Sequence, residues 1–396
     1  MEAQVQTNLK GSTRLGNYLR RLRSGYGYSL RRVEERARAE GGEIDNSQLS
    51  RYEKGICYPS FDKLRVLASV FNVSIQAFSD VVDLEEYEDL KPESNDPREM
   101  IETGTGAMRA GEMGRAFAHF ERALEILEAE PGGEGWAEQV AQARINLAAA
   151  LIRLGKLSLA EQELRNALRA ADGLGDTLQA RALLQLASVH SDQGDLLLAE
   201  MEADRAHGIA ARAALHLLAA RARHVMAGVL AQRKRENEAI ERYREAAELY
   251  SRSGEVYEAT RVRISIGLCY VSLGKSREGI RLLRTALDEA ASGGHRYLEA
   301  YALSCLGEAY FRQKEPLRAQ SCLRQSDALA GTGERRYPDL LFLNAYYEWK
   351  IAAGQGNPTR EKIAFGRMKA LRPCVERRFP EVEAFDAHVE RGRNDV

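Results

Sequence analysis

The chain has 396 residues, which is too long for one compact core and allows two domains or an array of repeats. Aromatic residues make up 7% and there are only 9 prolines, a balance that favours helices over an all-β sandwich. A net charge of −1 argues against nucleic-acid binding by the chain as a whole, and no apolar run reaches the length of about 18 residues that a membrane span needs.

The N-terminus and the cysteines indicate a cytoplasmic protein. Met1–Lys10 is polar and lacks the apolar core of an export signal. The five cysteines are scattered and form no CxxC pair, which disfavours disulfide frameworks and zinc sites. We therefore expect a reducing compartment and no metal or other cofactor.

Charge divides the chain into three parts. Residues 1–80 carry 13 Lys and Arg against 9 Asp and Glu, whereas residues 81–99 carry 2 against 8. The remainder is nearly neutral, so the three parts have separate roles. Because residues 81–97 are acidic and contain two prolines, we interpret them as a linker with a short helix before Pro92. We hypothesise that this acidic stretch folds back on the basic segment.

Residues 12–80 are predicted to form five short helices. Leu15, Leu19 and Leu22 recur at helical spacing and define the apolar face of the first helix. Gly55 ends the third helix. Each of the other four helices follows a residue that is typical of an N-cap, namely Ser29, Asp45, Ser60 and Ser74.

The third of these helices is unusually polar. Leu49 and Tyr52 are three residues apart and are expected to face the core. Short polar side chains near a helix N-terminus reach base edges in DNA, and arginine bridges guanine with two hydrogen bonds. The outward-facing residues of this kind are Asn46, Ser47, Ser50 and Arg51.

These residues resemble the helix-turn-helix of the XRE family of phage-repressor-like regulators. The run Leu49-Ser50-Arg51-x-Glu53-x-Gly55 and the downstream Pro59-Ser60 carry the resemblance. Apolar positions of the fourth helix complete it, namely Leu64, Leu67, Ala68 and Phe71. Two features depart from the family pattern: Glu34 replaces a small residue, and the connection between the second and third helices is about five residues longer.

The resemblance implies DNA binding through the third helix. It assigns base contacts to Asn46, Ser47, Ser50 and Arg51, and phosphate contacts to Gln48 and Lys54. Glu53 is expected to serve the fold by pairing with an arginine of the first helix. A homodimer that reads a palindromic site is the usual arrangement for such a module. The alternative is a solvated polar helix without a function in recognition.

The remainder of the chain repeats with a period near 40 residues. Small residues recur at fixed offsets from each turn, which allows neighbouring helices to approach closely, and each copy is predicted to be two antiparallel helices of about 15–18 residues. The predicted turns lie at Gly111-Glu112, Gly155-Lys156, Gly194-Asp195, Lys234-Arg235, Gly274-Lys275, Lys314-Glu315 and Gly354-Gln355.

This spacing resembles the tetratricopeptide repeat, lengthened by about six residues from the usual 34. HEAT-type repeats have a similar period, but the offsets of the small residues fit the tetratricopeptide pattern better. The expected fold is all-α, with a helix-turn-helix domain (12–80), a linker (81–97) and a right-handed solenoid of about seven helix pairs (98–379). Residues 380–396 are expected to form a capping helix and tail.

The first helices of such pairs line a concave groove, for which the sequence offers polar candidates. Arginines at one helix offset are spaced by 40 residues twice and predict a basic ladder that holds a carboxylate or an acidic peptide. The candidate ligand-binding residues are Gln142, Asn146, Arg181, Arg221, Arg261 and Tyr301. The alternative is that these arginines pair with glutamates of adjacent helices.

No catalytic motif is present: GxxxxGK[ST], HExxH and GxSxG are all missing, and the seven histidines are scattered. We therefore expect no enzyme. Fusion of the two patterns resembles the peptide-pheromone-responsive regulators of bacterial quorum sensing, which implies a transcriptional regulator that senses a short peptide. The alternative is an interaction scaffold whose repeats bind a protein partner.

Overall fold

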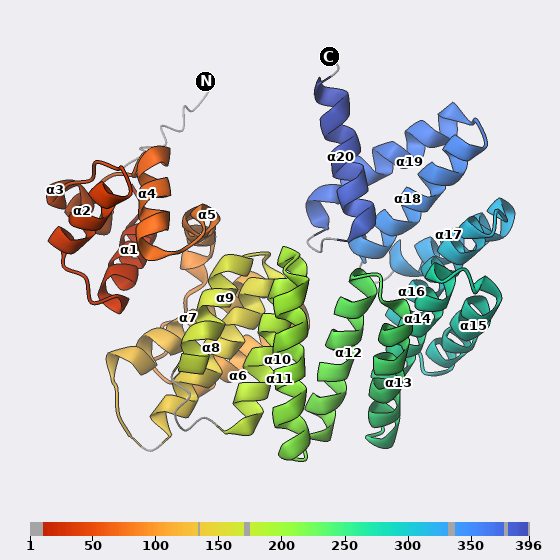
Figure 1. The fold of residues 1–396 in the computed structure, drawn as a ribbon, viewed down its shortest axis with the longest axis horizontal. Helices are drawn as coiled ribbons and strands as arrows, with labels where there is room; N and C mark the ends of the chain where they lie inside the picture. The colour runs from red at the N-terminus through yellow and green to blue at the C-terminus, as the bar shows by residue number, and fades with distance from the viewer. Residues whose placement is uncertain (1–10, 134, 170–174, 332–336, 376–378, 395–396) are drawn as a thin grey trace. The chain divides into compact units, whose positions relative to one another are not determined.

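The structure is a computed structural model that describes residues 11–133, 135–169, 175–331, 337–375 and 379–394, so Met1–Lys10 lies outside the described residues. All elements in these ranges are helical, which confirms the all-α prediction (Figure 1). The chain divides into two compact units, residues 1–170 and 171–396. In the described ranges no single helix is long and apolar enough to cross a membrane, and one helix pair that meets the length criterion is bent by 110°.

The first unit begins with five helices, which we call the head. They are α1 (Thr13–Gly25), α2 (Leu30–Ala39), α3 (Asn46–Glu53), α4 (Phe61–Phe71) and α5 (Ile75–Asp83).

The predicted N-caps begin the head helices as expected. The side chains of Ser29, Asp45 and Ser74 accept a hydrogen bond from a backbone N–H of the first helical turn. Ser60 is the N-cap of α4 but its side chain makes no such bond. Because these caps fix where the chain enters each helix, they set the boundaries that the sequence predicted.

A small apolar core joins the five helices. Leu19, Leu49, Phe71 and Phe78 are almost completely buried, and they come from α1, α3, α4 and α5. Gly16 of α1 lies so close to α3 that a Cβ atom would come within 2.6 Å of the Tyr52 carbonyl oxygen. The glycine therefore lets the backbones of α1 and α3 touch.

The residues that follow the head are folded rather than extended. Leu84–Leu90 forms the short 3₁₀ helix η1, and Leu84 is buried. The Tyr87 ring packs on Phe117, with centroids 6.0 Å apart. We call residues 84–96 the connector; it packs on the first repeat pair instead of forming a free tether. The short helix expected before Pro92 is present as η1.

Two helix pairs complete the first unit. They are α6 (Pro97–Ala110) with α7 (Met113–Ala129) and α8 (Trp136–Arg153) with α9 (Leu157–Arg169).

The second unit contains five further pairs and a last helix. The first helices of its pairs are α10 (Asp176–Gln193), α12 (His216–Gln232), α14 (Val256–Ser272), α16 (Arg296–Arg312) and α18 (Pro338–Gly354). Their partners are α11 (Leu196–Arg212), α13 (Glu236–Arg252), α15 (Ser276–Ser292), α17 (Pro316–Gly331) and α19 (Pro358–Leu371). Within this unit the first helices of several neighbouring pairs contact one another, α10 with α12, α14 with α16, and α16 with α18, and we call the outer surface of the first helices the A-helix face.

Small residues make the close contacts that the repeat pattern predicted. A Cβ atom on Gly267 would lie 2.8 Å from Leu283 Cγ, and one on Gly307 would lie 2.5 Å from Leu323 Cδ2. Both leucines are completely buried on the second helix of the same pair. Replacing either glycine would therefore push the two helices of its pair apart.

The tight turns occupy the left-handed backbone region. Gly155, Gly194 and Gly274 have positive φ angles, and Lys234 and Lys314 take the same conformation at about 60°. The prediction for the seventh copy is wrong by two residues, because α18 continues through Gly354 and the turn residue is Gly356, with φ of 61°.

The last helix covers the end of the second unit. After the 3₁₀ turn η2 (Arg372–Cys374), α20 (Pro380–Asn394) begins at the proline where the capping helix was expected. Val382 and Phe385 are buried beside Phe342 of α18 and Met368 of α19, and Figure 1 shows α20 beside these two helices. An apolar face of the seventh pair is thereby removed from water.

Candidate nucleic-acid interface and ligand face

The third helix of the head presents one polar face. Asn46, Ser47, Arg51 and Lys54 are exposed, and Ser50 is half-buried. At 100° per residue these positions fall within one side of α3, opposite the buried Leu49 and Tyr52. The structure thus brings together on one face the residues for which base and phosphate contacts were predicted.

The position of α3 is held by a buried ion pair. Glu53 is 5% exposed and accepts two hydrogen bonds from Arg23 of α1, at 2.6 and 2.9 Å. Arg20 adds a longer contact of 3.7 Å to the same carboxylate. This confirms the prediction that Glu53 pairs with an arginine of the first helix, and it fixes the end of α3 against α1.

Gln48 has a different environment from the other polar residues of α3. Its backbone N–H donates to the Asp45 carboxylate at 2.7 Å, and its side-chain oxygen accepts from Lys63 of α4 at 2.9 Å. The side chain therefore links α3 to α4 and places the Lys63 ammonium beside the polar face.

Sequence reasoning missed three apolar residues next to this face. Ile56, Tyr58 and Phe61 are 50%, 37% and 67% exposed; the first two lie in the turn after α3, and Phe61 is the first residue of α4. A signal for them was available, because the turn between Gly55 and Pro59 is too short for large side chains to reach the core. Apolar atoms beside basic residues suit thymine methyl groups and sugars.

In the second unit, the sequence singled out Arg221 of α12 and Arg261 of α14. The arginines two residues further along the chain, Arg223 and Arg263, have different partners. Arg223 of α12 pairs with Glu245 of α13 at 2.7 Å, and Arg263 of α14 pairs with Glu289 of α15. Arg221 is exposed, and among the described residues no carboxylate lies within ion-pair distance of it. In the part of the chain that the structure describes, Arg221 does not follow the alternative that the candidate arginines pair with glutamates of adjacent helices, whereas Arg223 and Arg263, which the sequence did not single out, make such pairs.

Arg181 and Arg221 lie close enough to influence each other. Burial, and then the positive charge of Arg221, lower the pKa of Arg181. Two neighbouring positive charges favour an anion between or beside them.

Arg261 belongs to a partly buried polar cluster. It pairs with Glu258 at 2.7 Å, and its Nη2 donates to Nδ1 of His224 at 3.3 Å. Burial, followed by the charge of Arg261, lowers the pKa of His224 to about 3, so the imidazole is neutral. The Tyr250 hydroxyl is buried nearby and has no hydrogen-bond partner among the described residues.

The remaining candidates are Gln142 and Asn146 in the first unit and Tyr301 in the second. Gln142 donates to Asn146 at 2.7 Å, and both belong to α8 of the first unit. Tyr301 of α16 stacks on Tyr297 with ring centroids 6.2 Å apart, and Tyr297 meets Tyr337 edge-on at 5.0 Å. The second unit therefore offers arginines on α10, α12 and α14, and tyrosine rings at the start of α16 and α18.

Comparison with protein families identifies the head. Residues 14–78 match the family described as helix-turn-helix domain. This range includes all of α2, α3 and α4, and therefore the polar face of α3. A comparison of the sequence with curated proteins finds no match.

Solved structures resemble the chain in fold. The apo form of RapI superimposes with a TM-score of 0.56 and 12% identity, covering 70% of this chain and 97% of that one. A Rap protein complexed with Competence and Sporulation Factor gives 0.54 and 14%, covering 69% and 76%. A tetratricopeptide repeat protein from Parabacteroides merdae gives 0.50 and 16%, covering 69% and 93%.

These matches agree with the helix pairs and the small-residue contacts described above. The chain therefore joins an N-terminal helix-turn-helix DNA-binding domain to a solenoid of tetratricopeptide-type helix pairs.

Proposed function

We propose that this protein is a sequence-specific transcriptional regulator whose repeats sense a ligand. The observation that carries the first part is the exposed polar face of α3 in a helix-turn-helix domain. Asn46, Ser47, Ser50 and Arg51 read bases, and Lys54 contacts a phosphate. Because Gln48 is bonded to Lys63, it contributes to phosphate binding through that lysine.

The DNA test uses the full chain and duplexes from the region upstream of its own gene. Arg51→Ala is expected to weaken binding to the preferred duplex by about 1–3 kcal/mol, roughly fivefold to 150-fold, and to relax base choice at one position. Lys54→Ala should weaken binding to all duplexes alike and lower the salt slope by about one. Arg115→Ala, on the distant and exposed side of α7, is the matched control.

The proposal for DNA recognition fails if the protein binds its upstream region no better than random DNA at physiological salt. It also fails if Arg51→Ala and Arg115→Ala behave alike. We propose a homodimer that binds a palindromic site, since one head offers few contacts. Sedimentation of the protein with one and with two half-sites measures this stoichiometry.

The ligand part of the proposal rests on Arg221 and its neighbours. Arg221 is exposed, has no carboxylate partner among the described residues, and, in addition to burial, lowers the pKa of Arg181 by its charge, so this pair of guanidiniums suits an anionic group. A short peptide supplies such a group in its C-terminal carboxylate or an acidic side chain. Arg181, Arg221, Arg261 and Tyr301 of the second unit are the proposed contacts. Gln142 with Asn146 is a separate candidate in the first unit, whose amide groups suit a peptide backbone.

A library of short peptides, made with free and with amidated C-termini, tests this idea by its effect on the melting temperature of the full chain. Replacing Arg181, Arg221 and Arg261 by Ala should abolish the shift given by an active peptide. The matched control replaces three exposed arginines of second helices, Arg205, Arg252 and Arg318. If the protein instead co-purifies with a stoichiometric protein and responds to no peptide, the repeats form a scaffold and sensing is excluded.

A further inference from the structure

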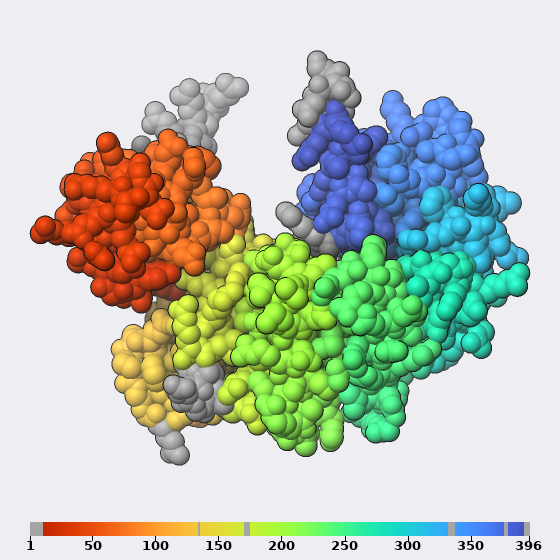
Figure 2. Space-filling model, in the orientation of Figure 1, coloured from red at the N-terminus to blue at the C-terminus, as the bar shows by residue number. Residues whose placement is uncertain are grey.

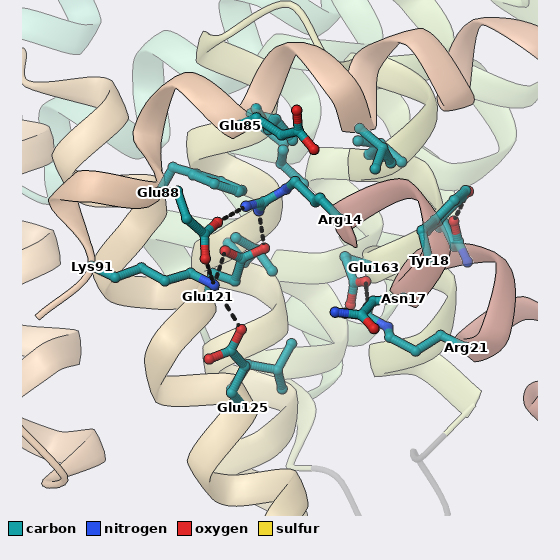
Figure 3. A pocket seen from close by; sticks show the side chains of 18 of the residues that line it. Arg14, Asn17, Tyr18, Arg21, Glu85, Glu88, Lys91, Glu121, Glu125 and Glu163 are labelled. Atoms are coloured by element: carbon teal, nitrogen blue, oxygen red, sulfur yellow. Dashed lines mark hydrogen bonds and ion pairs between the residues drawn. The ribbon is translucent and has the colours of Figure 1, made fainter. Parts of the chain in front are cut away.

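The head is joined to the first two helix pairs by three groups of polar contacts, all within the first unit. The largest group surrounds Arg14 of α1, whose side chain is only 13% exposed. Arg14 donates to Glu88 of the connector at 2.6 Å and to Glu121 of α7, and its guanidinium lies over the Phe117 ring at 5.1 Å. Lys91 reaches the same two carboxylates at 2.9 and 3.3 Å (Figure 3).

The second group lies further along α1 and faces the second pair. The Tyr18 hydroxyl donates to Gln162 of α9 at 2.8 Å, and Tyr18 is 8% exposed. Arg21 pairs with Glu163 of α9 at 3.2 Å, and Arg144 of α8 pairs with the other oxygen of this carboxylate. Figure 3 shows Tyr18 and Arg21 on the side of α1 that faces Glu163.

The third group lies at α5, where the head rests on the second pair (Figure 2). Ser74, the N-cap of this helix, donates to Ser158 at 2.8 Å. Lys156 at the start of α9 pairs with Asp83 at 2.6 Å and with the buried Asp80 at 3.5 Å.

Between these groups the contact is not fully packed. A cavity of about 340 Å³ lies between α1, the connector and helices α7, α8 and α9. Apolar side chains from both sides line its floor, namely Val81, Leu84, Phe117, Leu124, Leu147, Leu151 and Leu159. The position of the head on the first two helix pairs is therefore determined by the directional ion pairs and hydrogen bonds rather than by a continuous apolar interface.

The reading face takes no part in these contacts. Asn46, Ser47, Arg51 and Lys54 of α3 are exposed while α1 and α5 bind the repeats. Docking of the head therefore fixes its orientation without covering the surface that reads DNA.

From this arrangement we infer that the three groups form a latch, which makes the head and the first two repeat pairs a single rigid body. The latch consists of Arg14, Lys91, Tyr18, Arg21, Ser74 and Lys156 with their partners. Rotation of the head would separate Arg14, which is 13% exposed, from Glu121 of α7 and would take Arg21 away from Glu163, and a buried guanidinium without its carboxylate is costly. Movement of the first two pairs is thus transmitted directly to α3. The latch rests on the proposed function only in its consequence for DNA binding, and not in the contacts that form it.

A distance measurement that needs no DNA tests the latch. Spin labels are attached through Ser24→Cys at the exposed end of α1 and Glu102→Cys on α6. The three cysteines that are not buried are replaced first, by Cys57→Ser, Cys322→Ser and Cys374→Ser. The latched chain should give one narrow distance. Arg14→Glu and Lys156→Glu, separately, should broaden the distribution and add longer distances.

The two variants lie on opposite sides of the contact, so a folding defect of the head in Arg14→Glu leaves Lys156→Glu informative. Reversal of the pair, Lys156→Asp with Asp83→Lys, should restore the narrow distance. Arg115→Glu is the matched control, because Arg115 is 54% exposed and pairs only with Glu112 of its own helix. A broad distance in the parent chain, or an unchanged narrow one in both variants, overturns the latch whether or not the protein binds DNA.

Discussion

Two arginines of the first unit, Arg14 and Arg23, and one of the second unit, Arg221, have opposite environments. In the first unit, Arg14 and Arg23 each reach carboxylates of another element and are less than a fifth exposed. In the second unit, Arg221 is exposed on the A-helix face, and the described residues place no carboxylate beside it. Both kinds lie on amphipathic helices that look alike in the sequence.

The difference shows that pairing, not abundance, decides what an arginine does. Paired and buried guanidiniums hold elements in one geometry, because separating them leaves a charge without water or a partner. An exposed guanidinium beside another cation contributes little to folding and remains available to an anion. Three pairs of substitutions break or sharpen this comparison, starting with the largest expected effect.

Glu53→Ala removes the partner of the most buried arginine pair in the head. The change leaves Arg23, which is 19% exposed, without its carboxylate, and we expect the free energy of unfolding of the head to fall by about 2–3 kcal/mol. Hydrogen exchange of backbone amides in α1 and α3 measures this loss. DNA binding should decline with it, because α3 loses its support against α1.

Glu35→Ala is the control for this substitution. Glu35 pairs with Arg31 and Arg32 on the surface of α2, with side-chain exposures of 47–82%. Surface pairs of this kind are worth about 0.5 kcal/mol or less. Equal destabilisation by both substitutions would contradict a special role for burial at Glu53.

Local signals in the sequence predicted much of the fold. The caps Ser29, Asp45 and Ser74 act on the three or four residues that follow them, so their effect is written in adjacent positions. The period near 40 predicted the pairs because small residues such as Gly267 and Gly307 must recur wherever two helices touch. The polar face of α3 was likewise a pattern within a single helix.

Contacts between distant elements were beyond such reasoning. The partners of Arg14 and Tyr18 lie 74 to 144 residues away, and no periodicity connects them. The acidic stretch was expected as a linker that folds back on the basic segment; the Arg14–Glu88 pair is such a contact, whereas the packing of Tyr87 on α7 had no signal in the charge pattern. Likewise, nothing in the sequence indicates that Arg223 meets Glu245 whereas Arg221 meets no carboxylate among the described residues.

The partly buried position of His224 beside Arg261 makes the stability of the second unit depend on pH. An unfolded histidine has a pKa near 6.5, whereas burial and Arg261 lower the pKa of His224 to about 3 in the folded protein. As pH falls below 6.5, the unfolded state binds a proton that the folded state does not, so stability decreases. Between pH 7 and pH 5 this group alone should cost about 2 kcal/mol.

His224→Gln should remove that part of the pH dependence, because the amide oxygen accepts from Arg261 and does not titrate. Urea unfolding at pH 7 and pH 5 measures the difference. His216→Gln, at an exposed position of the same helix, is the matched control and should retain the full pH dependence. Identical pH profiles for the two variants would show that His224 is solvated rather than held beside Arg261.

The smallest effect separates Arg221 from Arg223. Arg223→Ala should lower the free energy of unfolding by about 0.5 kcal/mol through loss of the Glu245 pair. Arg221→Ala should leave stability unchanged or raise it slightly, because it relieves repulsion with Arg181, whose pKa the Arg221 charge lowers. Urea unfolding of both variants measures the two changes. If Arg221→Ala proved the more destabilising of the two, Arg221 would stabilise the fold like the paired arginines. It would then not be available on the A-helix face to bind an anionic ligand.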